Sequence, residues 1–223
     1  MGHPRLALCT LLGIVAIVVT TYGPAQSGAA AARPPFAAGT SWTYRDRRLE
    51  PSGTVRSGTM KVIYGGEATY RGKRVSFMDA SYALRPGFTE RLYLEWGGSH
   101  FRQVANVVTD AQRRAVEFVF DRPFRIRASE TASGTVRIFE SGTLRSAVPW
   151  SYASMANGSP KVTVPAGSFR ATRWDTVLRI GDRETRTSFF TVGHTDVRWE
   201  SAGYAAGAQT GTTEKALVKG PIR

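Results

Sequence analysis

The stretch "DTVLRIGDRETRTSFF" (residues 175–190) contains the pattern that decides the fold. Apolar and polar side chains alternate before and after Gly181-Asp182, a dipeptide that favours a turn. A period of two places successive side chains on opposite faces of a β-strand. The stretch therefore predicts two antiparallel strands joined by a tight hairpin.

Further hairpins are predicted along the chain. In "RLYLEWGGSHFRQV" (residues 91–104), Gly97-Gly98 can supply the positive φ angles of a hairpin turn. In "VVTDAQRRAVEFVF" (residues 107–120), a helix capped near Asp110 competes with a hairpin turn at Asp110-Ala111. The β-branched and aromatic residues that follow favour the hairpin. Turn signals recur about every ten residues, which is typical of an antiparallel sheet.

The segment "VTVPAGSFRATRW" (residues 162–174) interrupts the alternation with a proline and a glycine. Pro165 has the φ angle that a type I turn needs, and Gly167 can adopt the left-handed conformation that completes a hairpin loop. It contains no general base, metal ligand or phosphate-binding glycine loop. We interpret it as a corner that sets strand register.

The strand after this corner carries apolar residues on both faces. Trp174, Leu178 and Ile180 share one face, whereas Val177 lies on the other. Either both faces are covered or one face lines an apolar cavity. An ordinary interior with scattered apolar surface residues is the alternative.

The N-terminus has the layout of a secretory signal peptide, residues 1–32. A short basic start is followed by the apolar stretch Leu6 to Thr21 and by small residues up to Ala32. Cleavage is expected near Ala32, with Ala25 as the earlier alternative, and the mature protein is expected to be periplasmic or extracellular. A retained membrane anchor is the other interpretation, although the apolar stretch is shorter than the roughly 20 residues of a spanning helix.

The amino-acid composition limits the disulfides, metals and binding partners that are expected of the mature protein. The one cysteine, Cys9, lies in the signal segment, so the mature chain is expected to have neither disulfides nor cysteine-bound metals. Loss of Arg5 reduces the formal net charge from +13 to +12. This charge favours an anionic envelope surface, including peripheral membrane contact, over nucleic acid, for which no binding motif is present. An arginine-rich coding bias is the alternative explanation.

One antiparallel β domain is expected over residues 39–203, followed by a C-terminal tail, residues 204–223. Within that tail, Glu214 to Lys219 is a candidate for a last strand or a short turn.

No catalytic or metal site is predicted, and no cofactor. Ser99 and His100 are adjacent, and neighbouring side chains on a strand point to opposite faces. His194 and Asp196 share a face, but two ligands do not make a metal site. We therefore expect that the protein is not an enzyme.

Two motifs carry a family resemblance. "VTVPAGSFRATRWD" (residues 162–175) resembles the V-x-V-P-A-G-x-F segment of exported bacterial β-proteins of unassigned function, and "AGTSWTYR" (residues 38–45) resembles their opening strand. These proteins are similar to the LolA/LolB-like lipoprotein-carrier superfamily. The resemblance implies a single curved antiparallel sheet, an open or half barrel that can hold an acyl chain.

The leading functional hypothesis is an exported envelope protein that binds a lipid or another apolar ligand in the concavity of its sheet. Trp96, Phe101, Trp174 and Phe189 are the predicted ligand-binding residues. The alternative is a non-catalytic interaction protein that binds anionic polymers or a protein partner through its basic surface.

Overall fold

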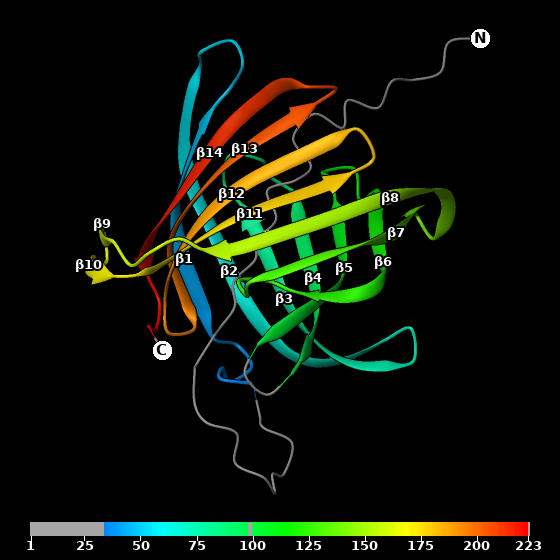
Figure 1. The fold of residues 1–223 in the computed structure, drawn as a ribbon, viewed down its shortest axis with the longest axis horizontal. Coiled ribbons are helices and arrows are strands. Elements are labelled where there is room, and N and C mark those ends of the chain that lie inside the picture. Colours follow the sequence, from blue (N-terminus) through cyan, green and yellow to red (C-terminus); the bar gives the residue numbers. More distant parts are fainter. Residues whose placement is uncertain (1–33, 98–99, 223) are drawn as a thin grey trace, which may run out of the picture.

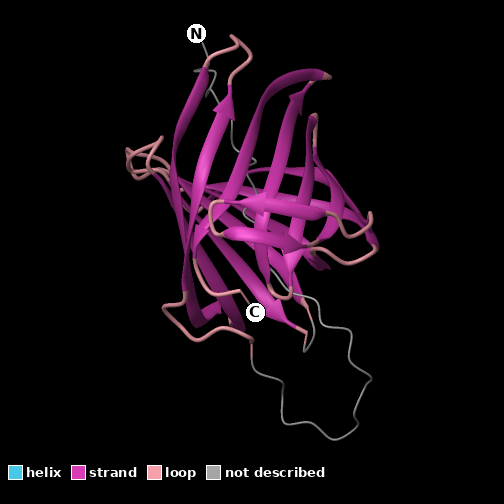
Figure 2. Ribbon diagram, turned by 90° about the vertical axis from the view of Figure 1, so that its left-hand side faces the viewer, coloured by secondary structure: helices cyan, strands magenta, loops and turns pink. Residues whose placement is uncertain are grey.

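The computed structural model of this protein describes residues 34–97 and 100–222. These two ranges contain fourteen β-strands, and Figure 2 shows the strands joined by loops. In chain order the strands are β1 (Ser41–Leu49), β2 (Val55–Tyr70), β3 (Lys73–Tyr82), β4 (Thr89–Trp96), β5 (Phe101–Thr109), β6 (Ala115–Arg125), β7 (Glu130–Glu140), β8 (Thr143–Ala156), β9 (Lys161–Val164), β10 (Gly167–Arg170), β11 (Thr172–Ile180), β12 (Arg183–Val192), β13 (Thr195–Ala205) and β14 (Ala208–Lys219).

Twelve of these strands form one closed antiparallel barrel (Figure 1). Around the barrel the order is β1, β14, β13, β12, β11, β8, β7, β6, β5, β4, β3 and β2, and β2 pairs again with β1. Most neighbours are therefore hairpins in the sequence. The ring is closed by β1 and β14, where Asp46 lies opposite Lys215 and Leu49 lies opposite Thr212. Closure gives every barrel strand a partner on both sides.

The expectation of an open or half barrel is wrong, although the mostly β assignment is confirmed. The closing strand β14 comes from residues 204–223, which were predicted as a C-terminal tail with Glu214 to Lys219 as a candidate last strand or short turn. Alanine, glycine and threonine dominate this segment, so it gives little of the hydrophobic signal typical of a strand. Its backbone nevertheless pairs with both β1 and β13, and this pairing depends on backbone groups rather than on side-chain type.

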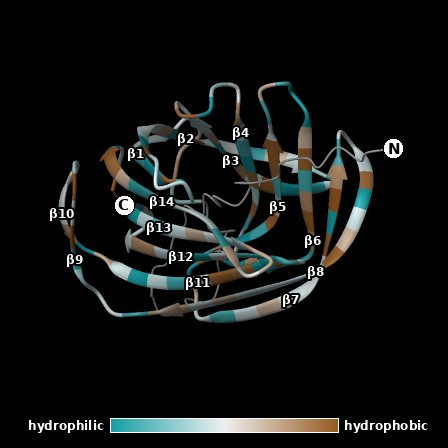
Figure 3. Cartoon of the chain, turned by 90° about the horizontal axis from the view of Figure 1, so that it is seen from above, coloured by the Kyte–Doolittle hydropathy of each residue, from teal (hydrophilic) through white to brown (hydrophobic). Residues whose placement is uncertain are grey.

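The barrel interior contains a packed aromatic core. Hydrophobic and hydrophilic residues alternate in bands along the strands in Figure 3, as expected when one face of each strand is buried. The Tyr44 and Trp199 rings pack edge to face with centroids 4.7 Å apart. The largest side chains with almost no exposure are Trp42, Trp199, Arg127, Tyr44, Tyr64, Phe101, Phe124, Met60, Met78, Leu92 and Leu94.

The hairpin of β9 and β10 forms a small separate sheet beside the barrel (Figure 1). Gly167 has a φ of 137°, and Val164 lies opposite it in the register, so the prediction of a tight corner is confirmed. The Ala166 amide donates to the Leu217 carbonyl at 3.0 Å, which ties the corner to β14. Val162 and Val164 are buried in the main core. The corner thus has a structural role.

Other predictions about the chain have mixed outcomes. The hairpin turn near Asp110 is confirmed, because β5 and β6 pair on either side of it. Strands β4 and β5 also pair as expected, whereas Gly98 of their predicted turn lies outside the described residues. The predicted signal peptide, residues 1–32, lies outside them as well. Over residues 34–97 and 100–222, no helix has the length and apolar character to cross a membrane.

The core predicts a large difference between two substitutions. Trp199→Ala removes a ring that is 2% exposed, so we expect the free energy of unfolding to fall by about 3–5 kcal/mol. Leu144→Ala removes a side chain that is 54% exposed, and we expect a change within about 0.5 kcal/mol. Urea unfolding followed by tryptophan fluorescence and circular dichroism measures both. Similar losses in the two variants would contradict the described core.

Candidate functional site: an outer groove

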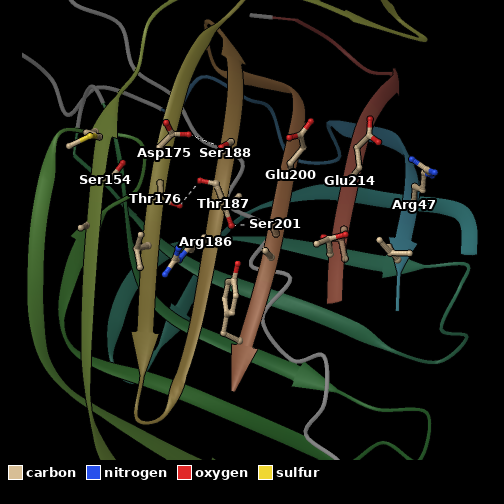
Figure 4. A pocket seen from close by; sticks show the side chains of 18 of the residues that line it. Arg47, Ser154, Asp175, Thr176, Arg186, Thr187, Ser188, Glu200, Ser201 and Glu214 are labelled. Carbon is tan, nitrogen blue, oxygen red and sulfur yellow. Dashed lines mark hydrogen bonds between the residues drawn. The ribbon is translucent and has the colours of Figure 1, made fainter. Parts of the chain in front are cut away.

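A groove crosses the outer face of the barrel over β8, β11, β12, β13, β14 and β1 (Figure 4). Its volume is about 830 Å³. Small-molecule sites in proteins usually have volumes of roughly 300–1,000 Å³. Strand alternation places the groove outside the barrel: Asp46 and Arg48 are buried on the inner face of β1, so Arg47 and Leu49 face outward into the groove.

Outward side chains line the groove in two rows that run across these six strands. The first row is mostly polar and consists of Met155, Asp175, Ser188, Glu200, Glu214 and Arg47, each opposite the next in the strand register. The second row is mostly small or apolar and consists of Ala153, Val177, Arg186, Ala202, Thr212 and Leu49. With strands about 4.8 Å apart, each row is about 24 Å long.

Between the rows the groove meets the strand backbone. Ser154, Thr176, Thr187 and Ser201 occupy this middle position, and their side chains point into the barrel. The Thr187 and Ser201 hydroxyl oxygens are 2.9 Å apart and share a hydrogen bond across β12 and β13 (Figure 4).

Large apolar side chains are exposed along the groove. Leu49, Val55 and Met155 are 44%, 47% and 63% exposed, respectively. Val177 and Ala202 add smaller apolar surface between them. Contiguous exposed apolar surface of this kind is typical of sites that bind another molecule.

The carboxylate of Asp175 is held firmly in the polar row. It accepts hydrogen bonds from Asn157 Nδ2 at 2.5 Å, Ser188 Oγ at 2.6 Å and Arg173 Nε at 2.8 Å. Burial alone raises the pKa of Asp175, but these donors outweigh burial and hold the pKa below its ordinary value. The group is therefore ionised at neutral pH and already compensated.

The other carboxylates of the polar row are also compensated. Glu200 and Glu214 lie opposite each other, an arrangement that is repulsive by itself. Arg198 forms ion pairs with both carboxylates, and Arg47 lies opposite Glu214 on the next strand. In the second row, Arg186 pairs with Glu184 at 2.5 Å. The charged side chains therefore interact with each other along the edges, and apolar surface remains for a ligand.

The four predicted ligand-binding residues lie elsewhere. Phe101, Trp174 and Phe189 are buried in the main core, and Trp96 packs against it with its ring centroid 4.7 Å from that of Phe101. Trp174 and Phe189 are opposite each other on β11 and β12. None of the four lines the groove. The interior void beside Phe189 has a volume of about 20 Å³, enough for a water molecule but not for a lipid.

Of the two polar pairs considered in the sequence, the structure describes both His194 and Asp196 but only His100 of the pair Ser99 and His100. Ser99 lies outside the described residues, and His194 packs near the rings of Phe36 and Trp96. Asp196 is fully buried, and its Oδ2 lies 2.6 Å from Nη2 of the equally buried Arg127. No group of three or more metal-ligating side chains is found in the described part of the chain.

Comparison with known proteins gives a fold-level likeness only. No protein-family model and no curated protein matches the sequence. A "putative lipoprotein" from Parabacteroides distasonis is 11% identical, with a TM-score of 0.46 over 82% of this chain and 95% of that chain. A "putative exported protein with YmcC-like fold" from Bacteroides fragilis is 12% identical, with a TM-score of 0.48 over 85% of this chain and 99% of that chain. Neither description names the lipoprotein-carrier superfamily. The expected similarity to that superfamily therefore stays a prediction.

Fold and groove together define the class of this protein: a closed antiparallel β-barrel with a packed core and an apolar groove outside. Sequence reasoning missed most groove residues, because Ala153, Ala202 and Thr212 become neighbours only through the strand register. The one available signal was Val177, an apolar residue on the opposite face of its strand from Trp174.

The buried pair predicts a pH dependence. Burial raises the pKa of Asp196 to about 7, against the attraction of Arg127. An unfolded aspartate titrates near pH 4, so between about pH 4 and 7 the folded state binds more protons. The contribution of Asp196 to the free energy of unfolding therefore falls as pH rises through this window.

Urea unfolding of the native protein and of Asp196→Asn at several pH values between 5 and 8 tests this. We expect the native protein to lose stability relative to the variant as pH rises, because asparagine does not titrate. If the free energies of unfolding of the two proteins change with pH in parallel, the proton uptake belongs to another group.

Proposed function

We propose that this protein is exported to the cell envelope and binds a lipid or another apolar ligand, without catalysis, in the outer groove. The single observation that carries the proposal is the 830 Å³ groove with exposed Leu49, Val55 and Met155 along it. A ligand covering these side chains gains a fraction of the roughly 1.5–3 kcal/mol that full burial of one such side chain contributes.

The groove replaces the interior as the proposed ligand site. Of the aromatic residues predicted to hold the ligand, Phe101, Trp174 and Phe189 are buried in the packed core, and the void beside Phe189 is far too small for a lipid. In the groove, Arg47 stands at the β1 end of the polar row and is exposed. Its guanidinium group is placed to bind an anionic head group of the ligand, while the hydrocarbon chain of the ligand lies against Val177 and Ala202.

The alternative is binding of an anionic polymer or a protein partner through the basic surface. The formal charge of +12 after signal removal supports it. Against it, carboxylates lie beside several exposed or half-buried arginines and interrupt the basic surface, as in the pairs of Arg91 with Asp79, Arg114 with Asp110 and Arg179 with Glu184. Binding that disappears at high salt would favour this alternative, because screening weakens charge contacts far more than apolar ones.

If the groove binds the ligand, two substitutions on β8 should differ in their effect on binding. Ala153 lines the groove, whereas Ala147 is exposed on the same outer face of the same strand, six positions earlier, and does not. We expect Ala153→Glu to weaken binding of a fluorescent fatty acid at least about tenfold, because the new carboxylate would be buried against the hydrocarbon chain of the fatty acid. We expect Ala147→Glu to bind like the native protein.

Fluorescence titration measures these affinities, and lipid extraction of purified protein with mass spectrometry shows whether an apolar molecule co-purifies. Undiminished binding by Ala153→Glu would place the ligand outside the groove. Failure of the native protein to bind any fatty acid or co-purify with a lipid would argue against the proposed function.

Export predicts a defined mature N-terminus. After expression in a bacterial host, mass spectrometry of the intact protein should show a chain that begins just after Ala32, or after Ala25 if the earlier site is used. A chain that retains Met1 and fractionates with membranes would instead indicate an anchor.

A further inference from the structure

Basic side chains lie on the outer face of the barrel near the end of β14. Lys219 of β14 lies opposite Thr43 of β1, and Thr43 lies opposite Lys61 of β2. Trp42 and Tyr44 on either side of Thr43 are buried, so strand alternation directs this row of three side chains outward. Both lysines are exposed, and their backbones are about 10 Å apart across two strand spacings.

The carboxylates diagonal to this row are engaged with other residues. Glu214 of β14 forms an ion pair with Arg198 at 3.4 Å. Asp79 of β3 accepts two hydrogen bonds from Arg91, at 2.6 and 2.8 Å. Arg45, the next outward residue of β1 after Thr43, is exposed as well. Over residues 34–97 and 100–222, no ion pair is formed by the three cations Arg45, Lys61 and Lys219.

The β9–β10 hairpin adds two cations at the same end of the barrel. The hairpin packs against β13 and β14, to which the Ala166 amide ties it (Figure 1). Lys161 lies opposite Arg170, and both are exposed, whereas Val162 between the hairpin and the barrel is buried. Like charges directly opposite each other repel, and neither forms an ion pair within the described part of the chain. An anionic partner would relieve this repulsion.

Two apolar side chains are exposed beside the cations. Val218 is 42% exposed at a bulge, where the register of β14 shifts relative to β1. Ile222 is 36% exposed, and the residue before it is held against the barrel. The Pro221 carbonyl accepts hydrogen bonds from Trp42 Nε1 at 3.0 Å and from Thr195 Oγ1 at 2.9 Å. The exposed apolar surface therefore has a fixed place next to the basic residues.

Together these residues form one surface, which we call the end patch: Lys61, Lys161, Arg170, Val218, Lys219 and Ile222. We propose that the end patch docks the protein on the surface of a bilayer that contains anionic lipids. Binding at such a surface depends on apolar area that enters the head-group region and on attraction between basic residues and anionic head groups. The end patch supplies both. A soluble anionic polymer would match the charges but would leave Val218 and Ile222 exposed.

The end patch is separate from the outer groove. Along the outer face of β1, Arg45 lies between Thr43 of the basic row and Arg47 of the groove. Docking through the end patch would therefore leave the groove on the side wall of the barrel, close to the bilayer. The proposal rests on the end patch and does not depend on ligand binding in the groove.

Flotation with vesicles tests the docking. The mature chain that begins after Ala32 is used, because it lacks the apolar signal segment. Phosphatidylcholine vesicles are compared with vesicles that also contain phosphatidylglycerol. We expect the native protein to float only with the anionic vesicles, and Lys61→Gln/Lys219→Gln to lose at least about tenfold in its partition to them.

The hairpin gives a second variant with two readouts. Lys161→Gln/Arg170→Gln should also lose at least about tenfold in partition to anionic vesicles. Because the substitution removes a repulsive pair, its thermal stability in solution should be no lower than that of the native protein. A loss of flotation in this variant is then not a consequence of unfolding, which circular dichroism checks for every variant.

Matched controls lie outside the end patch. Arg122→Gln/Arg137→Gln removes the same charge from β6 and β7, across the barrel from β1, and should float like the native protein. Val218→Ser should weaken partition at least about threefold. Leu144→Ser changes a more exposed apolar side chain outside the end patch and should leave partition unchanged.

Three results would overturn the proposal. The first is no flotation of the folded native protein with anionic vesicles. The second is an equal loss in Arg122→Gln/Arg137→Gln, which would indicate diffuse attraction to a basic protein. The third is native flotation by Val218→Ser together with tight binding of a soluble anionic polymer, which would indicate a polymer partner.

Ala153→Glu separates docking from ligand binding in the groove. This variant should float like the native protein, because Ala153 lies outside the end patch. Loss of flotation in Ala153→Glu alone would assign vesicle binding to the groove and would also overturn docking through the end patch. Flotation without any fatty-acid binding would support docking and contradict only the proposed function.

Discussion

The pairing of β1 with β14 is the constraint on which the rest of the structure depends. It brings together strands more than 150 positions apart in the chain and removes the two free edges that an open sheet would have. Once the ring is closed, every strand has one face toward a shielded interior and one toward the surroundings. The aromatic core, the buried ion pairs and the outer groove all follow from that division.

Closure also explains where ligands can and cannot lie. The middle of the barrel is occupied by closely packed rings such as Tyr44 and Trp199, and the void beside Phe189 has a volume of only about 20 Å³. Larger spaces lie at the barrel mouth and in the outer groove, between its two rows of side chains.

The same strands serve both spaces with opposite chemistry. On β1, the neighbouring residues Arg47 and Arg48 point to opposite sides of the wall, Arg47 toward the outer groove and Arg48 toward the buried carboxylate of Asp46. Outside, ion pairs leave little net charge along the groove. Inside, the buried carboxylate of Asp46 accepts hydrogen bonds from Arg48 and Lys215, shielded from solvent, where electrostatic interactions are stronger.

By itself, the sequence determined the antiparallel β class, the hairpin positions near Asp110 and Gly181, and the corner at Pro165, because these depend on local alternation and turn chemistry. Only the tertiary structure decided that β14 closes a barrel, that Trp174 and Phe189 are core residues, and that Ala153, Val177 and Ala202 form one surface. Closure and register are set by pairing between strands distant in sequence, and a one-residue shift in register would exchange inner and outer faces.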